Sequence, residues 1–125
     1  MKPEERGEVA ARVLALAREF HTMPDQIKVT REKADEAQKN LDRARARSRV
    51  KAPIIDPEDP ERRRKLTAED RDAYVVLDTE DEFDAWLVAN AAHEYQKDRV
   101  RARDKELSAL QTLQADARQE MRILG

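Results

Sequence analysis

The sequence predicts an all-α protein: a long helical hairpin or coiled coil with a Pro-rich linker, assembled as an oligomer. Charged residues make up 42% of the 125 residues and aromatic residues only 4%. Apolar residues recur at intervals of three and four positions in two long stretches. Dense charge with few large apolar side chains is typical of long, thin helices whose surface is mostly hydrated. Because such helices seldom stand alone, we expect a homo-oligomer.

The first segment, residues 1–49, is expected to form one kinked helix. Its 3-4 apolar spacing runs from Val9 to Leu41, which is typical of a coiled-coil stripe. Pro24 interrupts this stripe, since proline lacks the amide hydrogen and clashes with the preceding turn. The stripe keeps its phase across Pro24, so the pattern favours a kink or short turn within residues 21–25 over a separate domain.

The second segment, residues 50–66, is the predicted linker. Pro53, Pro57 and Pro60 forbid a continuous helix there and favour turns. The linker is too short to hold a core of its own. We therefore expect residues 1–125 to form a single helical domain.

The third segment, residues 67–125, is expected to be a long helical region. Thr67 and Thr79 are both followed three positions later by an acidic residue, and the pair at Thr79 is the stronger capping-box signal. The stretch 73–77 between them is compatible with a short helix, a turn or an extended piece. From Thr79 to Leu124 nothing in the sequence breaks a helix.

Several classes of catalytic and cofactor site are excluded by residue type. The chain has no cysteine, and its two glycines are Gly7 and Gly125, so neither a thiolate metal site nor a Gly-rich phosphate loop is possible. His93 and Glu94 begin like a zinc-protease helix, but Lys97 occupies the position of the second histidine ligand. We expect a protein that is not an enzyme, with no cofactor and no metal.

The sequence has no apolar run that would place it in a membrane. Its N-terminal residues, MKPEERGE, lack the apolar core of a signal peptide, and no apolar stretch approaches the ~18 residues of a membrane span. We expect a cytoplasmic protein without membrane contact.

Basic residues concentrate on both sides of the predicted linker. They occupy every second position before it and are consecutive after its last proline; these residues are Arg43, Arg45, Arg47, Arg49, Lys51, Arg62, Arg63, Arg64 and Lys65. On a helix, alternate positions lie on different faces, whereas an extended segment would place them all on one face. Either arrangement could neutralise several backbone phosphates, which is the salt-dependent and sequence-independent mode of nucleic-acid binding.

A plainer interpretation of these basic runs stands beside this one. Acidic residues crowd the same part of the sequence, so the arginines are also compatible with a solvated helix face or with ion pairs between subunits. Phe83 and Trp86 are expected in the core rather than as platforms for bases. The polar stretch 93–106 has no apparent structural role within a monomer, which makes it a second place to look for function.

The apolar stripes are the expected assembly surfaces. Large apolar side chains at 3-4 spacing pack against a partner helix in coiled coils. The members that we expect to face other copies of the chain are Val13, Leu16, Phe20, Ile27, Leu41, Leu107, Leu110, Met121 and Leu124.

Three stretches carry a resemblance to a known family. They are DEAQKNL at 35–41 running into the basic run 43–51, LTAEDRD at 66–72 leading through VVLDT to Phe83 and Trp86, and LSALQTL at 107–113. Together they resemble the small helical recombination-mediator proteins of bacteriophages, of the UvsY type, over roughly residues 31–124.

The resemblance implies a homo-oligomer, acting in the cytoplasm of a bacterial host cell, that binds single-stranded DNA and helps to load a RecA-type recombinase while displacing single-strand-binding protein. In that family, basic residues near the helix–linker junction contact DNA, which corresponds here to the run 43–51 with residues 62–65 as an extension. The acidic insert DPEDPE at 56–61 departs from this pattern. The alternative is a non-catalytic coiled-coil structural or adaptor protein, such as a phage assembly or host-interaction factor, that binds no nucleic acid.

Overall fold

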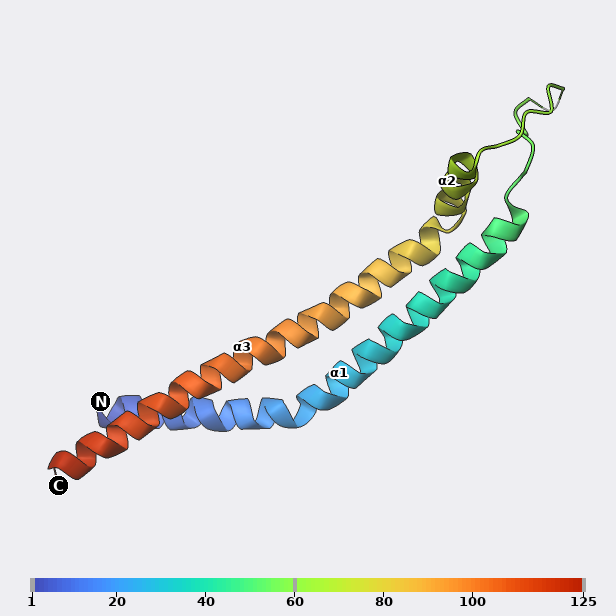
Figure 1. Cartoon of the computed structure of the whole chain (residues 1–125). Helices are drawn as coiled ribbons and strands as arrows, with labels where there is room; N and C mark the ends of the chain where they lie inside the picture. The colour runs from blue at the N-terminus through green and yellow to red at the C-terminus, as the bar shows by residue number, and fades with distance from the viewer. Residues whose placement is uncertain (1, 60, 125) are drawn as a thin grey trace. The chain divides into compact units, whose positions relative to one another are not determined.

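The protein consists of three helices over the residues that the structure describes, 2–59 and 61–124. In the computed structural model, α1 spans Pro3–Lys51, α2 spans Ala68–Asp78 and α3 spans Glu80–Leu124 (Figure 1). The β-type pairing recorded within those ranges is a single isolated bridge. The predicted all-α class is confirmed.

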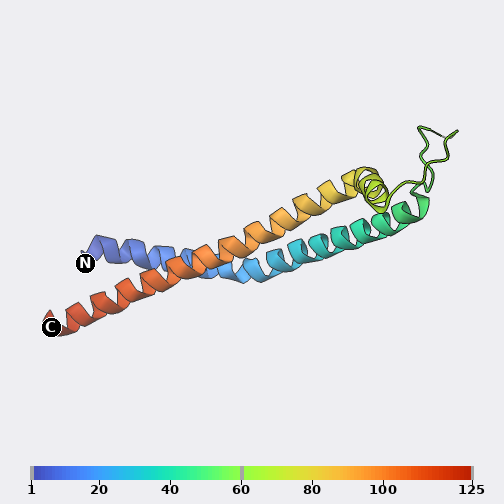
Figure 2. The same ribbon diagram turned by 45° about the horizontal axis from the view of Figure 1, so that its top comes forward.

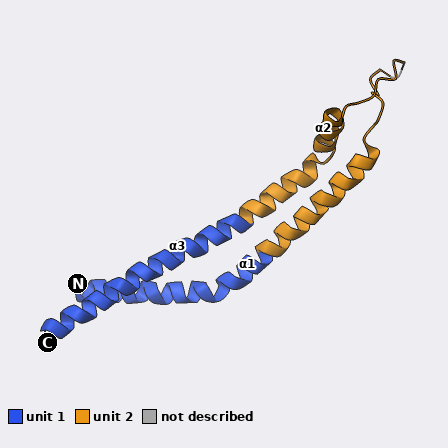
Figure 3. Ribbon diagram, in the orientation of Figure 1, with its two compact units in different colours: residues 1–29, 93–125 blue, residues 30–92 orange. Residues whose placement is uncertain are grey.

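The chain divides into two compact units, and α1 and α3 contribute to both of them. Unit 1 holds residues 1–29 and 93–125, and unit 2 holds residues 30–92 (Figure 3). Among the described residues, no helix combines the length and the apolar character that crossing a membrane requires.

Unit 1 pairs the first half of α1 with the second half of α3 in antiparallel fashion. The Arg6 side chain donates to the Met121 sulfur at 2.8 Å, and the Arg99 side chain donates to Gln26 at 2.9 Å. The first turns of α1 and the last turns of α3 accordingly lie at the same end of this unit (Figures 1 and 2). Its buried apolar side chains are Leu16, Met23 and Ala117.

Pro24 bends α1 without ending it. The helix continues through Pro24 to Lys51, so a break within residues 21–25 is excluded. The part of α1 that belongs to unit 1 changes direction along its length (Figure 3), as expected from the lost amide donor and the ring clash. Leu16 and Met23, both on the N-terminal side of the proline, are 0% and 2% exposed, so packing within unit 1 offsets part of the cost of the missing hydrogen bond.

Unit 2 packs the second half of α1 against α2 and the start of α3. The buried edge of α1 in this unit consists mostly of small residues, namely Ala34, Leu41, Ala44 and Ser48, and Ala52 just after the helix is buried as well. On the opposite side, Val75 and Thr79 are buried. Small side chains let two helices approach closely, which leaves little room for a larger core.

The two threonines predicted as helix caps have different roles. The Thr67 hydroxyl accepts from the Asp70 amide at 3.1 Å, and the Asp70 carboxylate accepts from the Thr67 amide at 3.2 Å, so the capping box of α2 is confirmed. This hydrogen bonding lowers the pKa of Asp70. The hydrogen bond recorded for the Thr79 hydroxyl is instead one that it donates to the Val75 carbonyl at 2.7 Å.

The segment of α2 that the sequence left undecided, residues 73–77, is helical. Thr79 therefore ends one helix, and α3 begins at the next residue. The chain changes helix there without a loop, and the Val75 carbonyl accepts from both the Thr79 amide at 3.1 Å and the Thr79 hydroxyl at 2.7 Å.

The linker begins later than predicted, because α1 continues to Lys51. Its two ends are held together by backbone hydrogen bonds: the Asp56 amide donates to the Arg64 carbonyl, and the Leu66 amide donates to the Ile54 carbonyl, both at 2.8 Å. Arg63, at φ 49°, has the left-handed conformation that a tight turn requires. The linker thus folds back on itself as a loop.

The residues predicted to join copies of the chain have different environments. Leu16 and Leu41 are 0% and 2% exposed within their own units, so their assignment to an intermolecular surface is corrected. Met121 and Leu124 are exposed. The rest are half-buried: Val13, Phe20, Ile27, Leu107 and Leu110. The sequence gives the spacing of a stripe, but a hairpin can cover it as well as a second chain can.

Candidate nucleic-acid interface

The basic run 43–51 lies on the last turns of α1, within unit 2. Because it is helical, the extended arrangement is excluded and the alternation separates the run into two rows. Arg43, Arg47 and Lys51 form the first basic row, with a rise of about 6 Å between successive members. Arg45 and Arg49 form the second basic row.

The first basic row is exposed along its length. Within residues 2–59 and 61–124, no ion pair is recorded for Arg43, Arg47 or Lys51. Arg47 and Lys51 border a polar hollow of about 240 Å³ that also has Asp78 and Glu82 in its wall. Of the three cations in the row, only Arg43 does not border the hollow that contains these carboxylates.

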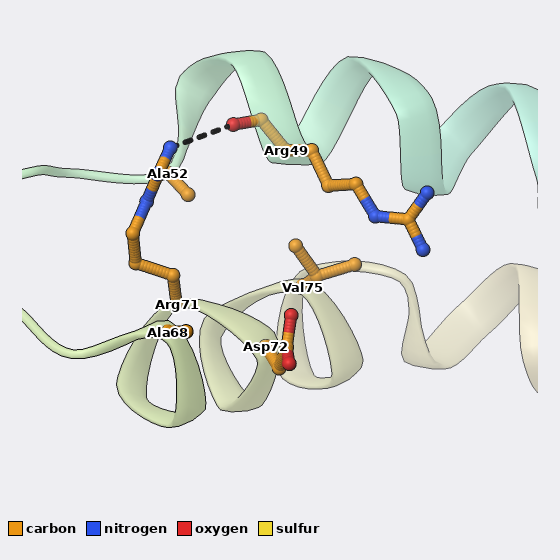
Figure 4. Close-up of a pocket in the computed structure, with 6 residues that line it drawn as sticks. All are labelled: Arg49, Ala52, Ala68, Arg71, Asp72 and Val75. Carbon is orange, nitrogen blue, oxygen red and sulfur yellow. Dashed lines mark hydrogen bonds between the residues drawn. The ribbon is translucent and has the colours of Figure 1, made fainter.

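The two members of the second basic row differ in their surroundings: Arg45 is half-buried and Arg49 is exposed. The Arg45 guanidinium carbon lies 5.9 Å from the centroid of the Phe83 ring, a cation–π distance. Arg49 borders a hollow of about 200 Å³ with Asp72 and Val75, and its carbonyl accepts a 3.3 Å hydrogen bond from Arg71 (Figure 4). The Arg49 side chain extends away from Arg71 in this view. Arg45 is therefore partly engaged by the fold, whereas Arg49 is exposed and only its backbone carbonyl is hydrogen-bonded.

The aromatic pair differs from its prediction as core. Phe83 is 38% exposed and Trp86 is half-buried; their ring centroids are 5.9 Å apart, with an interplanar angle of 32°. Unit 2 has only α1 and the short α2 to place beside the start of α3, and they leave both rings partly exposed. The Arg45–Phe83 contact was missed from the sequence, since the register between α1 and α3 cannot be read from it.

The second basic group, residues 62–65, lies on the linker loop. All four side chains are exposed, and Arg62 contacts Asp59 at 3.5 Å. The loop carries four acidic residues at 56–61 and four basic residues at 62–65, so its formal charges cancel. It is a weaker phosphate-binding candidate than the first basic row.

The polar stretch 93–106 has a structural role that sequence reasoning did not find. Arg12 and Glu106 form a two-point contact at 2.6 and 2.9 Å. Arg103 and Arg99 reach the same Glu19 carboxylate, at 3.1 and 3.6 Å. The arginines of α3 thus bind α1 within unit 1. The expectation that this stretch is a functional surface is corrected: it joins two helices.

The Arg12–Glu106 ion pair shifts the pKa of both of its partners. Hydrogen bonding to the Arg12 guanidinium lowers the pKa of Glu106, and hydrogen bonding to Glu106 raises the pKa of Arg12. Both shifts favour the charged forms. Two further cations of this stretch pair along their own helix, Lys97 with Glu94 at 3.0 Å and Arg101 with Asp98 at 3.4 Å.

The charges of the two units thus differ in their partners. Unit 1 neutralises its basic stretch internally, whereas unit 2 leaves the first basic row available to an external anion. Comparison of the chain with protein families, curated proteins and solved structures finds no significant match.

Proposed function

We propose that this protein binds single-stranded nucleic acid without sequence specificity, through the first basic row of α1. The observation that carries the proposal is the row itself: Arg43, Arg47 and Lys51 are exposed and have no ion-pair partner among the residues described. Cations in a hydrated row release counterions when they neutralise phosphates, which supplies affinity that is independent of base sequence.

The spacing of the row suits an extended strand better than a compact anion. Its three cations are about 6 Å apart along the helix axis, so they can contact successive phosphates of one strand. Arg62–Lys65 on the linker loop would extend this surface. Asp78 and Glu82, near Arg47 and Lys51, oppose phosphate binding, and they limit the affinity that the row can provide.

The biological role that we propose is that of a recombination accessory protein, which assists the loading of a RecA-type recombinase on single-stranded DNA. This role rests on the resemblance to phage mediator proteins alone. It involves no catalytic step and no cofactor, because the protein would act by holding the strand and contacting the recombinase or the single-strand-binding protein.

The direct test is salt-dependent binding of a fluorescent single-stranded oligonucleotide, measured by anisotropy. The triple variant Arg43→Gln, Arg47→Gln, Lys51→Gln removes the row. We expect the slope of log affinity against log salt to fall by about 2, since each phosphate contact on a single strand contributes about 0.7.

A matched control removes the same charges from the same helix. Arg18→Gln, Lys28→Gln and Lys33→Gln also neutralise exposed cations of α1, but at positions outside the four-residue spacing of the row. We expect the control to bind nearly as the unaltered protein does. Equal loss in both triple variants would reduce the effect to net charge and reject the row as the site.

The second candidate function is that of a coiled-coil adaptor that binds protein only. The exposed apolar side chains of unit 2 favour it, because Val76, Leu77 and Val88 are 66%, 73% and 72% exposed. This function predicts no change in anisotropy with any oligonucleotide at low salt.

A further inference from the structure

The start of α3 and the end of α2 carry an apolar patch around a hollow. Val76, Leu77 and Phe83 line this hollow of about 410 Å³, and they are 66%, 73% and 38% exposed. Leu87, one turn beyond Phe83 on α3, is 44% exposed. We call these four residues the α2–α3 patch. Contiguous exposed apolar surface of this kind marks an interaction site rather than a solvated face.

The rim of the hollow carries charges of both signs. Arg45, Glu80 and Asp84 all belong to the lining of this hollow. No ion pair is recorded for any of the three in the described part of the chain. An apolar centre with a mixed charged rim is the usual anatomy of a protein–protein interface.

We propose that the α2–α3 patch is the interface between two copies of this chain. A two-fold axis places the same surface on both sides, so Arg45 of each copy faces Glu80 and Asp84 of the other. The surface is thus complementary to itself in charge. At its centre, Leu77 of each copy covers the hollow of the other, which removes these apolar side chains from water.

The charges of the rim argue against the other occupants. Glu80 and Asp84 repel phosphates, so a nucleic-acid strand is a poor partner for this hollow. A foreign protein would need its own cation opposite Glu80 and Asp84 and its own carboxylates opposite Arg45. A second copy of this chain carries these groups already. The proposal does not depend on nucleic-acid binding, since the first basic row is on a different face of α1.

The first test is the mass of the full chain in solution, measured by light scattering and by sedimentation over a range of concentrations. We expect a dimer of the 14.5 kDa chain. Leu77→Glu puts a charge at the centre of the patch and should weaken dimerisation by at least about tenfold, as for a residue central to an interface.

The matched control is Ile123→Glu. Ile123 is also on the surface, at 77% exposure against 73% for Leu77, but it lies near the end of α3 in unit 1. This variant should dimerise as the unaltered chain does. Helical circular dichroism verifies that both variants are folded, and the single tryptophan, Trp86, in contact with Phe83, reports on the patch: its emission should move to longer wavelength when dilution separates the copies.

The second test exchanges charges between copies and does not depend on the core of the patch. Arg45→Glu alone and Glu80→Arg alone should each weaken the dimer, because each places like charges opposite one another. A mixture of the two variants should form a heterodimer, since Arg45→Glu then meets Glu80→Arg while the unaltered Arg45 meets Glu80 and Asp84, and only one contact with Asp84 remains between like charges.

Three results would overturn the proposal. One is a monomer at every concentration. Another is a variant result of the wrong sign: the Leu77→Glu chain still dimerises, or the charge-exchange mixture does not restore the dimer. The third is loss of oligonucleotide binding in Leu77→Glu with unchanged mass, which would assign the patch to nucleic acid. Loss of the first basic row leaves the dimer intact, so the two proposals fail separately.

Discussion

The basic stretch 97–105 of unit 1 and the basic run 43–51 of unit 2 look alike in sequence but have different surroundings. In unit 1, Glu19 on α1 receives both Arg99 and Arg103 from α3. In unit 2, no carboxylate of the described residues lies within ion-pair distance of Arg43–Lys51. An alternating basic sequence therefore indicates a binding surface only where the fold leaves it unpaired.

The difference originates in what faces each stretch. The buried edge of α1 in unit 2 includes small residues such as Ala44 and Ser48, which bring the α2–α3 junction close to the helix. Arg45 reaches the Phe83 ring on α3, whereas Arg43 and Arg47 project beside the contact and are exposed. In unit 1, Arg12 and Glu106 reach across the helix pair and close it by charge.

The largest effects should come from the leucines at the centre of each unit. Leu16→Ala in unit 1 and Leu41→Ala in unit 2 should each lower the free energy of unfolding by about 2–5 kcal/mol, because both side chains are fully buried and leave a cavity. Hydrogen exchange should locate the loss in the unit that carries the change. Leu14→Ala, at a 54% exposed position of the same helix, is the control, and exchange that rises equally in both units would show that the units are not separate.

Overpacking should distinguish the close helix contact of unit 2. Ser48 is 1% exposed, so Ser48→Leu should cost about 1–3 kcal/mol of stability in chemical denaturation. The control Ser48→Ala removes a buried hydroxyl oxygen that lacks a partner and should be neutral or stabilising. Destabilisation by Ser48→Ala comparable to that by Ser48→Leu would mean that the hydroxyl, not the space, matters here.

The ion pairs of unit 1 should contribute less. Glu19→Gln deprives Arg99 and Arg103 of a shared carboxylate and should lower stability by up to about 1 kcal/mol in low salt. The effect should shrink in 1 M salt, which screens charges beyond about 3 Å. Glu8→Gln, at an exposed position of the same helix half, should have no effect; a loss that salt does not change would contradict an electrostatic role.

The smallest effect should be a pH dependence centred on Glu106. Its pKa is lowered in the folded state by Arg12, so the stability that it contributes is fully present above the ordinary glutamate value of about 4.3. That contribution is lost as the pH falls below this value and through the lower folded pKa. The difference in stability between the unaltered chain and Glu106→Gln, measured by denaturation at a series of pH values, should therefore shrink as the pH falls below about 5. The difference between the unaltered chain and Glu4→Gln should stay constant over the same series.

Much of the local structure could be predicted from residues close together in sequence. Thr67 with Asp70 marked the start of α2, and the absence of breakers after Thr79 predicted α3. One kinked helix through Pro24 was expected from the phase of the apolar stripe, with a short turn within residues 21–25 left open, and the structure has the kinked helix. The sequence alone could not decide between the two, because the outcome depends on how this part of α1 packs within unit 1.

The candidate site divides in the same way. The density of cations at 43–51 was evident from the sequence, as was the acidic character of the linker. Which cations are available was not, since Arg45 contacts Phe83 through a register that no local pattern encodes. The same holds for Phe83 and Trp86, which the sequence assigned to a core that one facing helix cannot complete.

By itself, then, the sequence determined the two long helices, the N-cap of α2, the approximate position of the linker loop and the two concentrations of basic residues. These properties follow from backbone propensity and from spacing along one chain. The tertiary structure alone decided that Leu16 and Leu41 are covered within the chain, that Glu19 receives two arginines, and that the first basic row and the α2–α3 patch are uncovered. Burial and pairing depend on which helices meet and in what register. The register is set by the sum of many contacts between residues that are distant in sequence, and no single segment encodes it.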